Sequence, residues 1–469
     1  MKNNSIPLIA KKTFITLLLL LLIIAPLYLY KLQSIPTNIT GDENTYLADV
    51  YRILFGGRMI SPAELMGDGT QPAINFYLMS LLITFLGFNN AVLGMRLTAV
   101  IFSLATICVF YVLLKRYTSS LTSFFITILL ATSILYTNLS RFGNGLFTHG
   151  ALLLGMLMIY FLEGALKENK LRLFIFSAFF GGLCFYSYFI AKVYPLAAFI
   201  YLSFYLIFYK PSLQKIKAYL VFNFILALTI LPLIFSVFDN KTFYFLRPSS
   251  VFILNNLSSI HNSATGVLLS QSIDVIKGLV LIDGSAIGKG VENLRYFPSA
   301  TPVVDTIIKM LFFAGLFLSL VMRLKLGIWW IVYLLTLIVV TITIDAPNLS
   351  RSIPALPFIY LLAGIALNEL IKITKRKLSL VTITALLIVI VSLISVYNIK
   401  HYFSWIQSSQ VARARQPAIE YEEFSAWQNY QIQRIKNNET PITNYDWYQI
   451  RSTMFKTHSK QKEKVLPSK

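Results

Sequence analysis

The sequence predicts an all-α membrane protein that crosses the bilayer many times. Hydrophobic residues make up 56% of its 469 residues, whereas charged residues make up only 13%. Apolar runs of about 18 residues or more recur as far as residue 397, and each is long enough to cross a hydrocarbon core of about 30 Å as a helix. This pattern excludes a soluble enzyme, a secreted disulfide scaffold and a disordered chain.

The charge balance fits the same class of protein. Lys and Arg number 41 against 20 Asp and Glu, a formal net charge of +21. In a polytopic protein such an excess is typical of cytoplasmic loops, so we expect no nucleic-acid partner. Cys108 and Cys184 both lie in apolar runs, which excludes a disulfide framework and a cysteine-ligated metal. The histidines have no metal-ligand spacing to one another.

The first apolar run, at 13–30, follows Lys2, Lys11 and Lys12 and resembles a signal peptide. It is too long for a typical signal-peptide core, and no cleavage site of small residues follows it. We therefore expect a retained first helix whose N-terminus is cytoplasmic.

The number of spans depends on one short run, 73–88. If this run lies on the outer surface, every Lys/Arg cluster between later helices falls in a cytoplasmic loop; if it spans, all of them move outside. We therefore expect 73–88 to be a juxtamembrane or re-entrant helix. The prediction is about eleven spans, the N-terminus inside and the C-terminus outside. The spans after the first are expected at 91–114, 119–138, 144–162, 173–190, 193–209, 218–238, 303–322, 326–344, 352–370 and 378–397.

This topology divides the chain into two parts. Residues 1–397 form the transmembrane bundle, with outer loops at 31–90 and 239–302. Residues 398–469 are polar and are expected to form a small helical appendage on the outer face.

Positive residues on the outer side run against the charge bias and are therefore candidates for function. They are Arg96, Arg141, Lys192, Lys309 and Arg351. Each has two explanations, since a long cationic side chain can anchor a helix at lipid headgroups or can bind a phosphate together with other donors. The sequence alone does not decide between them.

The first outer loop contains an acidic pair, Asp42-Glu43, at the start of a short amphipathic helix. This pair has two explanations. In one, Asp42 caps the helix and Glu43 is a first-turn carboxylate that interacts with the helix dipole. In the other, the pair takes part in catalysis. The apolar face of this helix is expected to lie on the membrane surface, and it comprises Leu47, Val50, Tyr51 and Leu54.

Further motifs follow this pair in a recognisable order. The set resembles the GT-C glycosyltransferases, in the branch of the protein mannosyltransferases and the lipid A aminoarabinose transferases, over roughly residues 1–370. One departure is Gln71-Pro72-Ala73, where the family has His/Glu-Pro-Pro. The motifs are Asp42-Glu43, Tyr46, Ala48, Gly56-Gly57, Gln71-Pro72-Ala73, Tyr77, Arg96, Ser140-Arg141, Asn348, Arg351 and Pro354-Ala355-Leu356-Pro357.

The resemblance implies transfer of a sugar from a polyprenyl-phosphate carrier to an acceptor on the outer membrane face. The acceptor could be a protein, a lipid or a glycan. The resemblance places Asp42 at the catalytic centre with Glu43 as its neighbour. It does not decide whether a divalent cation takes part, because relatives of both kinds exist.

A phosphate can leave without a protein acid, so one carboxylate suffices as general base while cationic side chains stabilise the leaving group. We expect Asp42 to be the base, and a single displacement would invert the anomeric centre. The expected phosphate ligands are Arg141, Lys192, Arg351 and Arg96, with Arg247 and Arg295 as substitutes.

Two other classes of function remain at this point. A transporter or flippase would need charges near the bilayer midplane, of which the spans have few. A non-catalytic assembly protein for lipid-linked glycans would not need Asp42. The expected location is the bacterial cytoplasmic membrane.

Overall fold

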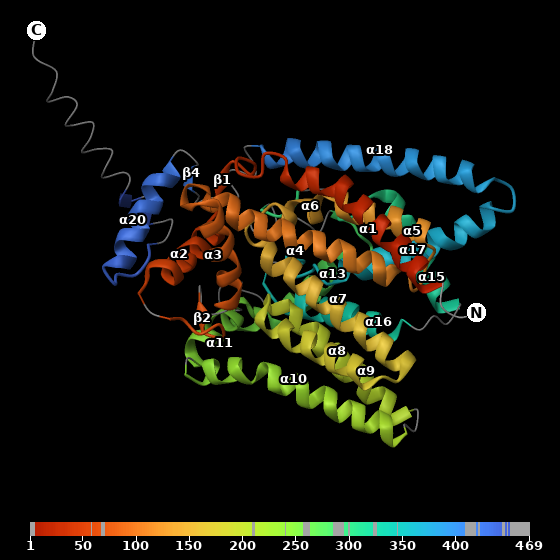
Figure 1. The fold of residues 1–469 in the computed structure, drawn as a ribbon, viewed down its shortest axis with the longest axis horizontal. Coiled ribbons are helices and arrows are strands. Elements are labelled where there is room, and N and C mark those ends of the chain that lie inside the picture. The colour runs from red at the N-terminus through yellow and green to blue at the C-terminus, as the bar shows by residue number, and fades with distance from the viewer. Residues whose placement is uncertain are drawn as a thin grey trace, which may run out of the picture.

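The computed structural model is a bundle of helices with very little β-structure (Figure 1). It describes residues 5–57, 59–66, 71–208, 212–239, 241–256, 263–284, 295–298, 301–321, 326–344, 346–408, 419–420, 423–442, 446–447 and 449–450.

Each predicted run coincides with an apolar helix or with a bent pair of helices. Within the described residues, seven helices are long and apolar enough to cross a membrane, or eight if the pair α5 and α6, bent by 67°, is one span. The helices that correspond to the predicted runs are α1 (Ser5–Leu29), α4 (Ala91–Leu114), α5 (Ser120–Thr132), α6 (Ile134–Ser140), α7 (Gly145–Glu168), α8 (Leu171–Leu183), α9 (Val193–Phe208), α10 (Leu213–Asp239), α15 (Thr306–Val321), α16 (Gly327–Thr341), α17 (Ala355–Thr374) and α18 (Leu380–Ile406). The protein is thus an integral, multi-pass, all-α membrane protein.

The doubtful run forms α3 (Ile74–Leu86), a helix of 13 residues. At 1.5 Å per residue it is about 20 Å long, shorter than the hydrocarbon core of about 30 Å. Its length therefore agrees with a helix that does not span.

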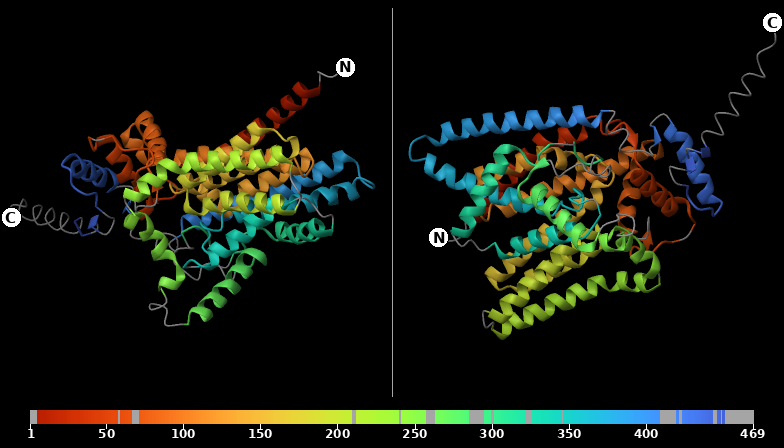
Figure 2. Two further views of the ribbon diagram at one scale, coloured as in Figure 1. Left: turned by 90° about the horizontal axis from the view of Figure 1, so that it is seen from below. Right: turned by 180° about the vertical axis from the view of Figure 1, so that it is seen from behind.

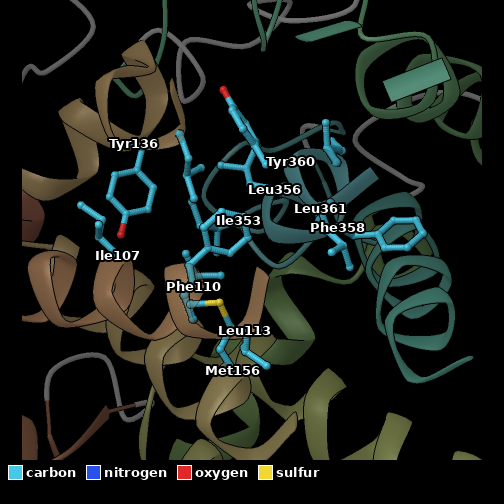
Figure 3. Packing of buried hydrophobic residues seen from close by; sticks show 14 of the residues in the cluster. Ile107, Phe110, Leu113, Tyr136, Met156, Ile353, Leu356, Phe358, Tyr360 and Leu361 are labelled. Carbon is cyan, nitrogen blue, oxygen red and sulfur yellow. The ribbon is translucent and has the colours of Figure 1, made fainter. Parts of the chain in front are cut away.

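The core lies between α4, α6, α7 and α17. Figure 3 shows Phe110 of α4 and Met156 of α7 packed towards Ile353 and Leu356, which lead into and begin α17. Small residues allow neighbouring helices to approach closely, as is usual in membrane proteins. A Cβ on Gly315 of α15 would lie 1.9 Å from the backbone oxygen of Leu362 in α17, so no larger residue fits there.

One end of the bundle is formed by the first outer loop together with a C-terminal segment. It contains α2 (Gly41–Phe55), α3 and α20 (Phe424–Lys436), and all three views place these elements at the opposite end from the start of α1 (Figures 1 and 2). Strand β1 (Asn38–Ile39) pairs antiparallel with β4 (Ile419–Glu420). Strand β2 (Leu65–Met66) pairs antiparallel with β3 (Gln71–Pro72).

The amphipathic helix of this loop is present as α2, but its apolar face does not serve to hold it on the membrane. Leu47, Val50 and Tyr51 are buried in one cluster with Phe76 of α3 and Trp427 of α20. The expected contact with lipid is therefore replaced by contact with protein, because α20 returns to this end of the bundle.

The segment 239–302 adds further helices. They are α11 (Lys241–Val251), η4 (Ile253–Asn256), α13 (Ala264–Val275) and the π-helical turn η5 (Ile276–Val280). Helix α13 of this segment packs against η5 and α16. Phe252 forms an isolated antiparallel bridge with Thr343, which joins this segment to the connection between α16 and α17. Helix α18 continues to Ile406, past the expected boundary at residue 397.

Candidate active site

A cavity of about 770 Å³ lies where the first outer loop meets the segment 239–302 and the α16–α17 connection. The described residues of its walls include one carboxylate, three cationic side chains, several amides and many aromatic rings. The lining residues are Asp42, Thr45, Tyr46, Gln71, Asn144, Tyr188, Phe189, Lys192, Tyr244, Phe245, Pro248, Ser249, Val251, Phe252, Asn255, Arg295, Tyr296, Ile342, Thr343, Asn348, Ser350 and Arg351.

Asp42 enters this cavity from the first turn of α2. The cap of that helix is Thr40, whose Oγ1 accepts a hydrogen bond from the backbone nitrogen of Glu43 at 3.3 Å. In return, the Thr40 backbone nitrogen donates to Glu43 Oε2 at 3.2 Å, which completes a capping box. Asp42 is therefore not the N-cap, so that explanation of its side chain does not hold.

Glu43 points away from the cavity into the protein. Its carboxylate is fully buried, and the Nε of Arg96 donates to Oε1 at 3.0 Å. The same oxygen accepts the backbone N–H of Gly143 at 3.1 Å. Glu43 thereby fixes the start of α2 against α4 and the α6–α7 turn, and so it fixes where Asp42 stands.

Arg96 is 1% exposed and does not line the cavity. Besides its ion pair with Glu43, its Nη1 donates to the carbonyl oxygens of Leu32 at 3.2 Å and Pro36 at 2.9 Å, and its Nη2 donates to that of Asn38 at 3.1 Å. These bonds hold the segment that leads from α1 to α2. This placement gives Arg96 a structural role in place of the expected contact with a donor phosphate.

Arg141 is also turned away from the cavity. It is fully buried, and its Nη1 donates to the carbonyl oxygens of Leu27 at 2.8 Å and Tyr28 at 2.7 Å. Its Nη2 donates to those of Tyr30 at 2.6 Å and Ile35 at 3.1 Å. Burial lowers the pKa of this guanidinium from its usual value. Arg141 thus caps the C-terminal end of α1, where cations are favoured, and does not occupy the expected position of a phosphate ligand.

Lys192 and Arg351, in contrast, both line the cavity. Lys192 ends the short helix η3 (Phe189–Lys192), and its Nζ donates to Tyr244 Oη at 2.5 Å. Nη1 of Arg351 donates to the carbonyl oxygen of Ile344 at 2.7 Å, while its buried Nε has no hydrogen-bond partner. An ammonium has three donors and a guanidinium five, so both groups keep donors for a ligand.

The sequence missed some of the lining residues and ranked others too low. Arg295, expected only as a substitute, lines the cavity, and the side chain of Arg247 lies outside the described residues. Gln71 was noted only as a departure from a family motif. It lines the cavity, is 6% exposed, and its Oε1 has no hydrogen-bond partner.

The described lining contains a single carboxylate, that of Asp42. No group of three or more His, Cys, Asp or Glu side chains among the described residues is placed to hold a metal ion. The arrangement can place one base beside a region of positive charge and surround both with rings and amides, which are suited to sugar hydroxyls and sugar faces.

Comparison with known proteins agrees with this architecture. Residues 70–235 match the model of the dolichyl-phosphate-mannose-protein mannosyltransferase family. The chain matches no curated protein sequence significantly.

Two solved structures share the fold. ArnT from Cupriavidus metallidurans bound to undecaprenyl phosphate is 13% identical, with a TM-score of 0.51 over 89% of this chain and 77% of that one. The oligosaccharyltransferase from Archaeoglobus fulgidus, in complex with Zn and sulfate, is also 13% identical, with a TM-score of 0.50 over 91% of this chain and 58% of that one.

Proposed function

We propose that this chain, which has the GT-C fold that its sequence motifs predicted, transfers a sugar from a polyprenyl-phosphate carrier to a hydroxyl group of an acceptor, with Asp42 as the general base. One observation carries this proposal: Asp42 is the sole carboxylate in the described lining of a cavity that also contains Lys192, Arg295 and Arg351.

In the proposed reaction, Asp42 takes the proton of the acceptor hydroxyl as its oxygen attacks the anomeric carbon. The bond between that carbon and the phosphate oxygen breaks, and the electron pair leaves with the phosphate. Lys192, Arg295 and Arg351 stabilise the charge that grows there. A second protein carboxylate is unnecessary, because the leaving phosphate needs no proton from an acid. One displacement inverts the anomeric centre.

A lipid-linked donor explains why this site belongs to a membrane bundle. The polyprenyl tail stays in hydrocarbon while the phosphate and the sugar reach a cavity at the bundle's end. ArnT, which shares the fold at low identity, was solved with undecaprenyl phosphate, and this supports a carrier of the same class here. The sugar would lie among aromatic residues such as Tyr46, whose hydroxyl donates to Asn144 Oδ1 at 3.1 Å.

The experiment compares Asp42→Asn with the parent protein. The change keeps the shape of the side chain and removes the base, so transfer should fall by a factor of about 10² or more while binding of undecaprenyl phosphate is retained. Purified protein would be incubated with membranes and a panel of undecaprenyl-phosphate-linked monosaccharides. Release of undecaprenyl phosphate and the glycan product would be measured by mass spectrometry, with and without EDTA to test for a divalent cation.

Near-normal transfer in Asp42→Asn would contradict the proposed base. The same variant separates the transferase from a flippase, which does not need a general base. If proteoliposomes of the parent protein and of the Asp42→Asn variant move lipid-linked sugar across the bilayer equally well and form no glycan product, transport replaces transfer as the function.

The proposal places the cavity on the outer face of a bacterial cytoplasmic membrane, with the N-terminus inside and the C-terminus outside. Met59 is 97% exposed in the first loop, and Lys377 lies in the connection between α17 and α18. In a background without Cys108 and Cys184, a cysteine at 59 should react with an impermeant thiol reagent added to intact cells. A cysteine at 377 should not react, and the opposite result would invert the topology.

A further inference from the structure

A second cavity lies at the other end of the bundle. It has a volume of about 460 Å³ and is formed by α1, by the C-terminal end of α4 and by the start of α5. Arg96 marks the active-site end of α4, because it pairs with Glu43, the neighbour of Asp42. Lys115, the C-cap of α4, is 19 positions further along, which corresponds to about 30 Å of helix between this cavity and the candidate active site. The lining residues are Lys12, Thr13, Ile15, Thr16, Tyr111, Lys115 and Ser120.

The charge of this cavity has one sign. Lys12 and Lys115 line it, and α1, α4 and α5 contain no Asp or Glu residue. The Nζ of Lys115 donates to Thr13 Oγ1 at 2.8 Å, which leaves two of its three N–H donors for a ligand. Ser120 begins α5, so the positive end of that helix dipole adds to the field of the lysines.

A hydroxyl group in the wall has no partner. Tyr111 is fully buried, its ring lies 5.5 Å from Lys115 Nζ, and its Oη forms no hydrogen bond. A buried hydroxyl without a partner is unfavourable, and an oxygen of a bound anion would remove that cost by accepting its proton. An unpaired hydroxyl on a lining residue is therefore compatible with a ligand that has oxygen acceptors.

The surroundings indicate that this ligand has an apolar tail. Ile15 lines the cavity, and it belongs to an exposed apolar side of α1 that also includes Phe14, Leu18 and Leu22. We propose that the cavity binds the phosphate group of an anionic phospholipid, with the acyl chains lying along α1. Lys12, Lys115 and Tyr111 would hold the phosphate oxygens, and the two ammonium groups would favour a headgroup with net negative charge over a zwitterionic one. This lipid site is separate from the site of the sugar donor.

The test uses the purified full-length protein in an uncharged detergent and measures binding of phosphatidylglycerol by native mass spectrometry. Phosphatidylcholine, which has the same phosphate group but a zwitterionic headgroup without net charge, serves as the comparison lipid. Lys12→Gln combined with Lys115→Gln should weaken binding of phosphatidylglycerol at least tenfold, because two charge-assisted contacts are lost. The matched control is Lys375→Gln, since Lys375 is exposed between α17 and α18 and does not line the cavity. It should leave the affinity unchanged.

Tyr111→Phe gives a readout that a merely structural tyrosine would not give. It removes a hydroxyl without a partner, so the lipid-free protein should unfold at the same temperature or higher, while affinity for phosphatidylglycerol falls several-fold. This variant decides the question if the double lysine variant does not fold. Unchanged affinity in Tyr111→Phe, an equal loss in Lys375→Gln, or equal binding of phosphatidylcholine would overturn the proposal. Binding of inorganic phosphate as tight as that of the lipid would replace the phospholipid with a soluble anion.

Discussion

Two pairs of cationic residues met the same sequence criteria and have different surroundings. Arg96 and Arg141 are 1% and 0% exposed, and both are surrounded by backbone carbonyl groups. Lys192 and Arg351 line the large cavity and keep donors that the protein does not use. An unexpected cation on the predicted outer side therefore has two different causes, and its hydrogen-bond partners distinguish them.

The first pair compensates for the irregular chain that follows α1. The last carbonyl groups of a helix have no partner within the helix, and a segment without regular structure adds more of them. Arg141 takes those of Leu27 and Tyr28, and Arg96 takes those of Leu32 and Pro36. The two arginines thus hold the segment between α1 and α2. They contribute to the site indirectly, because Asp42 lies in the first turn of α2.

Arg96→Ala should produce the largest effect on stability. It leaves the buried carboxylate of Glu43 without its counterion, and breaking a buried pair in this way costs about 3–5 kcal/mol. Thermal unfolding in detergent would measure the loss. Lys372→Ala is the control, because its ion pair with Glu369 joins side chains that are 61% and 24% exposed and should contribute less than about 1 kcal/mol. Similar unfolding temperatures for the two variants would refute the structural role of Arg96.

Arg351→Ala should show the reverse behaviour. Loss of a charge-assisted contact to a bound phosphate costs about 1.5–3 kcal/mol, so affinity for undecaprenyl phosphate should fall tenfold to a hundredfold. Thermal stability should change little in comparison with Arg96→Ala. Isothermal titration with undecaprenyl phosphate checks the first expectation and thermal unfolding the second. Normal affinity together with a large fall in melting temperature would move Arg351 into the class of Arg96.

The features that the sequence predicts are those set by local patterns, and the features that it misses depend on contacts between distant segments. Apolar runs predicted the membrane helices, the Lys/Arg clusters predicted that 73–88 does not span, and helical periodicity predicted α2 with Asp42 and Glu43 at its start. These signals are local. The packing of loops that are far apart in the chain decides which cations line the cavity. One such contact is the hydrogen bond that Asn138 donates to the carbonyl oxygen of Tyr296, a lining residue. A single sequence contains no local trace of such contacts.

The buried face of α2 is a second feature that local sequence patterns could not predict in full. The sequence correctly predicts that Leu47, Val50 and Tyr51 share an apolar face, but it does not indicate what covers that face. For a helix expected near the membrane, lipid is the apolar partner that the sequence suggests. In the structure α20 packs against this face instead, and Gln428 Nε2 donates to Tyr51 Oη at 2.7 Å, although the two residues are 377 positions apart.

Gln428→Ala should have the smallest effect of the three, and it should be local. The change leaves the buried hydroxyl of Tyr51 and the carbonyl oxygen of Phe88 without this donor, at a cost of about 1–3 kcal/mol. Because α20 joins the rest of the protein mainly through α2, the cost should appear as faster hydrogen exchange in α20 and α2, with little change in the bundle. Gln433→Ala on the exposed side of the same helix is the control. If both variants exchange at the parental rate, α20 is held by its apolar contacts alone, and the C-terminal segment does not help to position Asp42 through this polar contact.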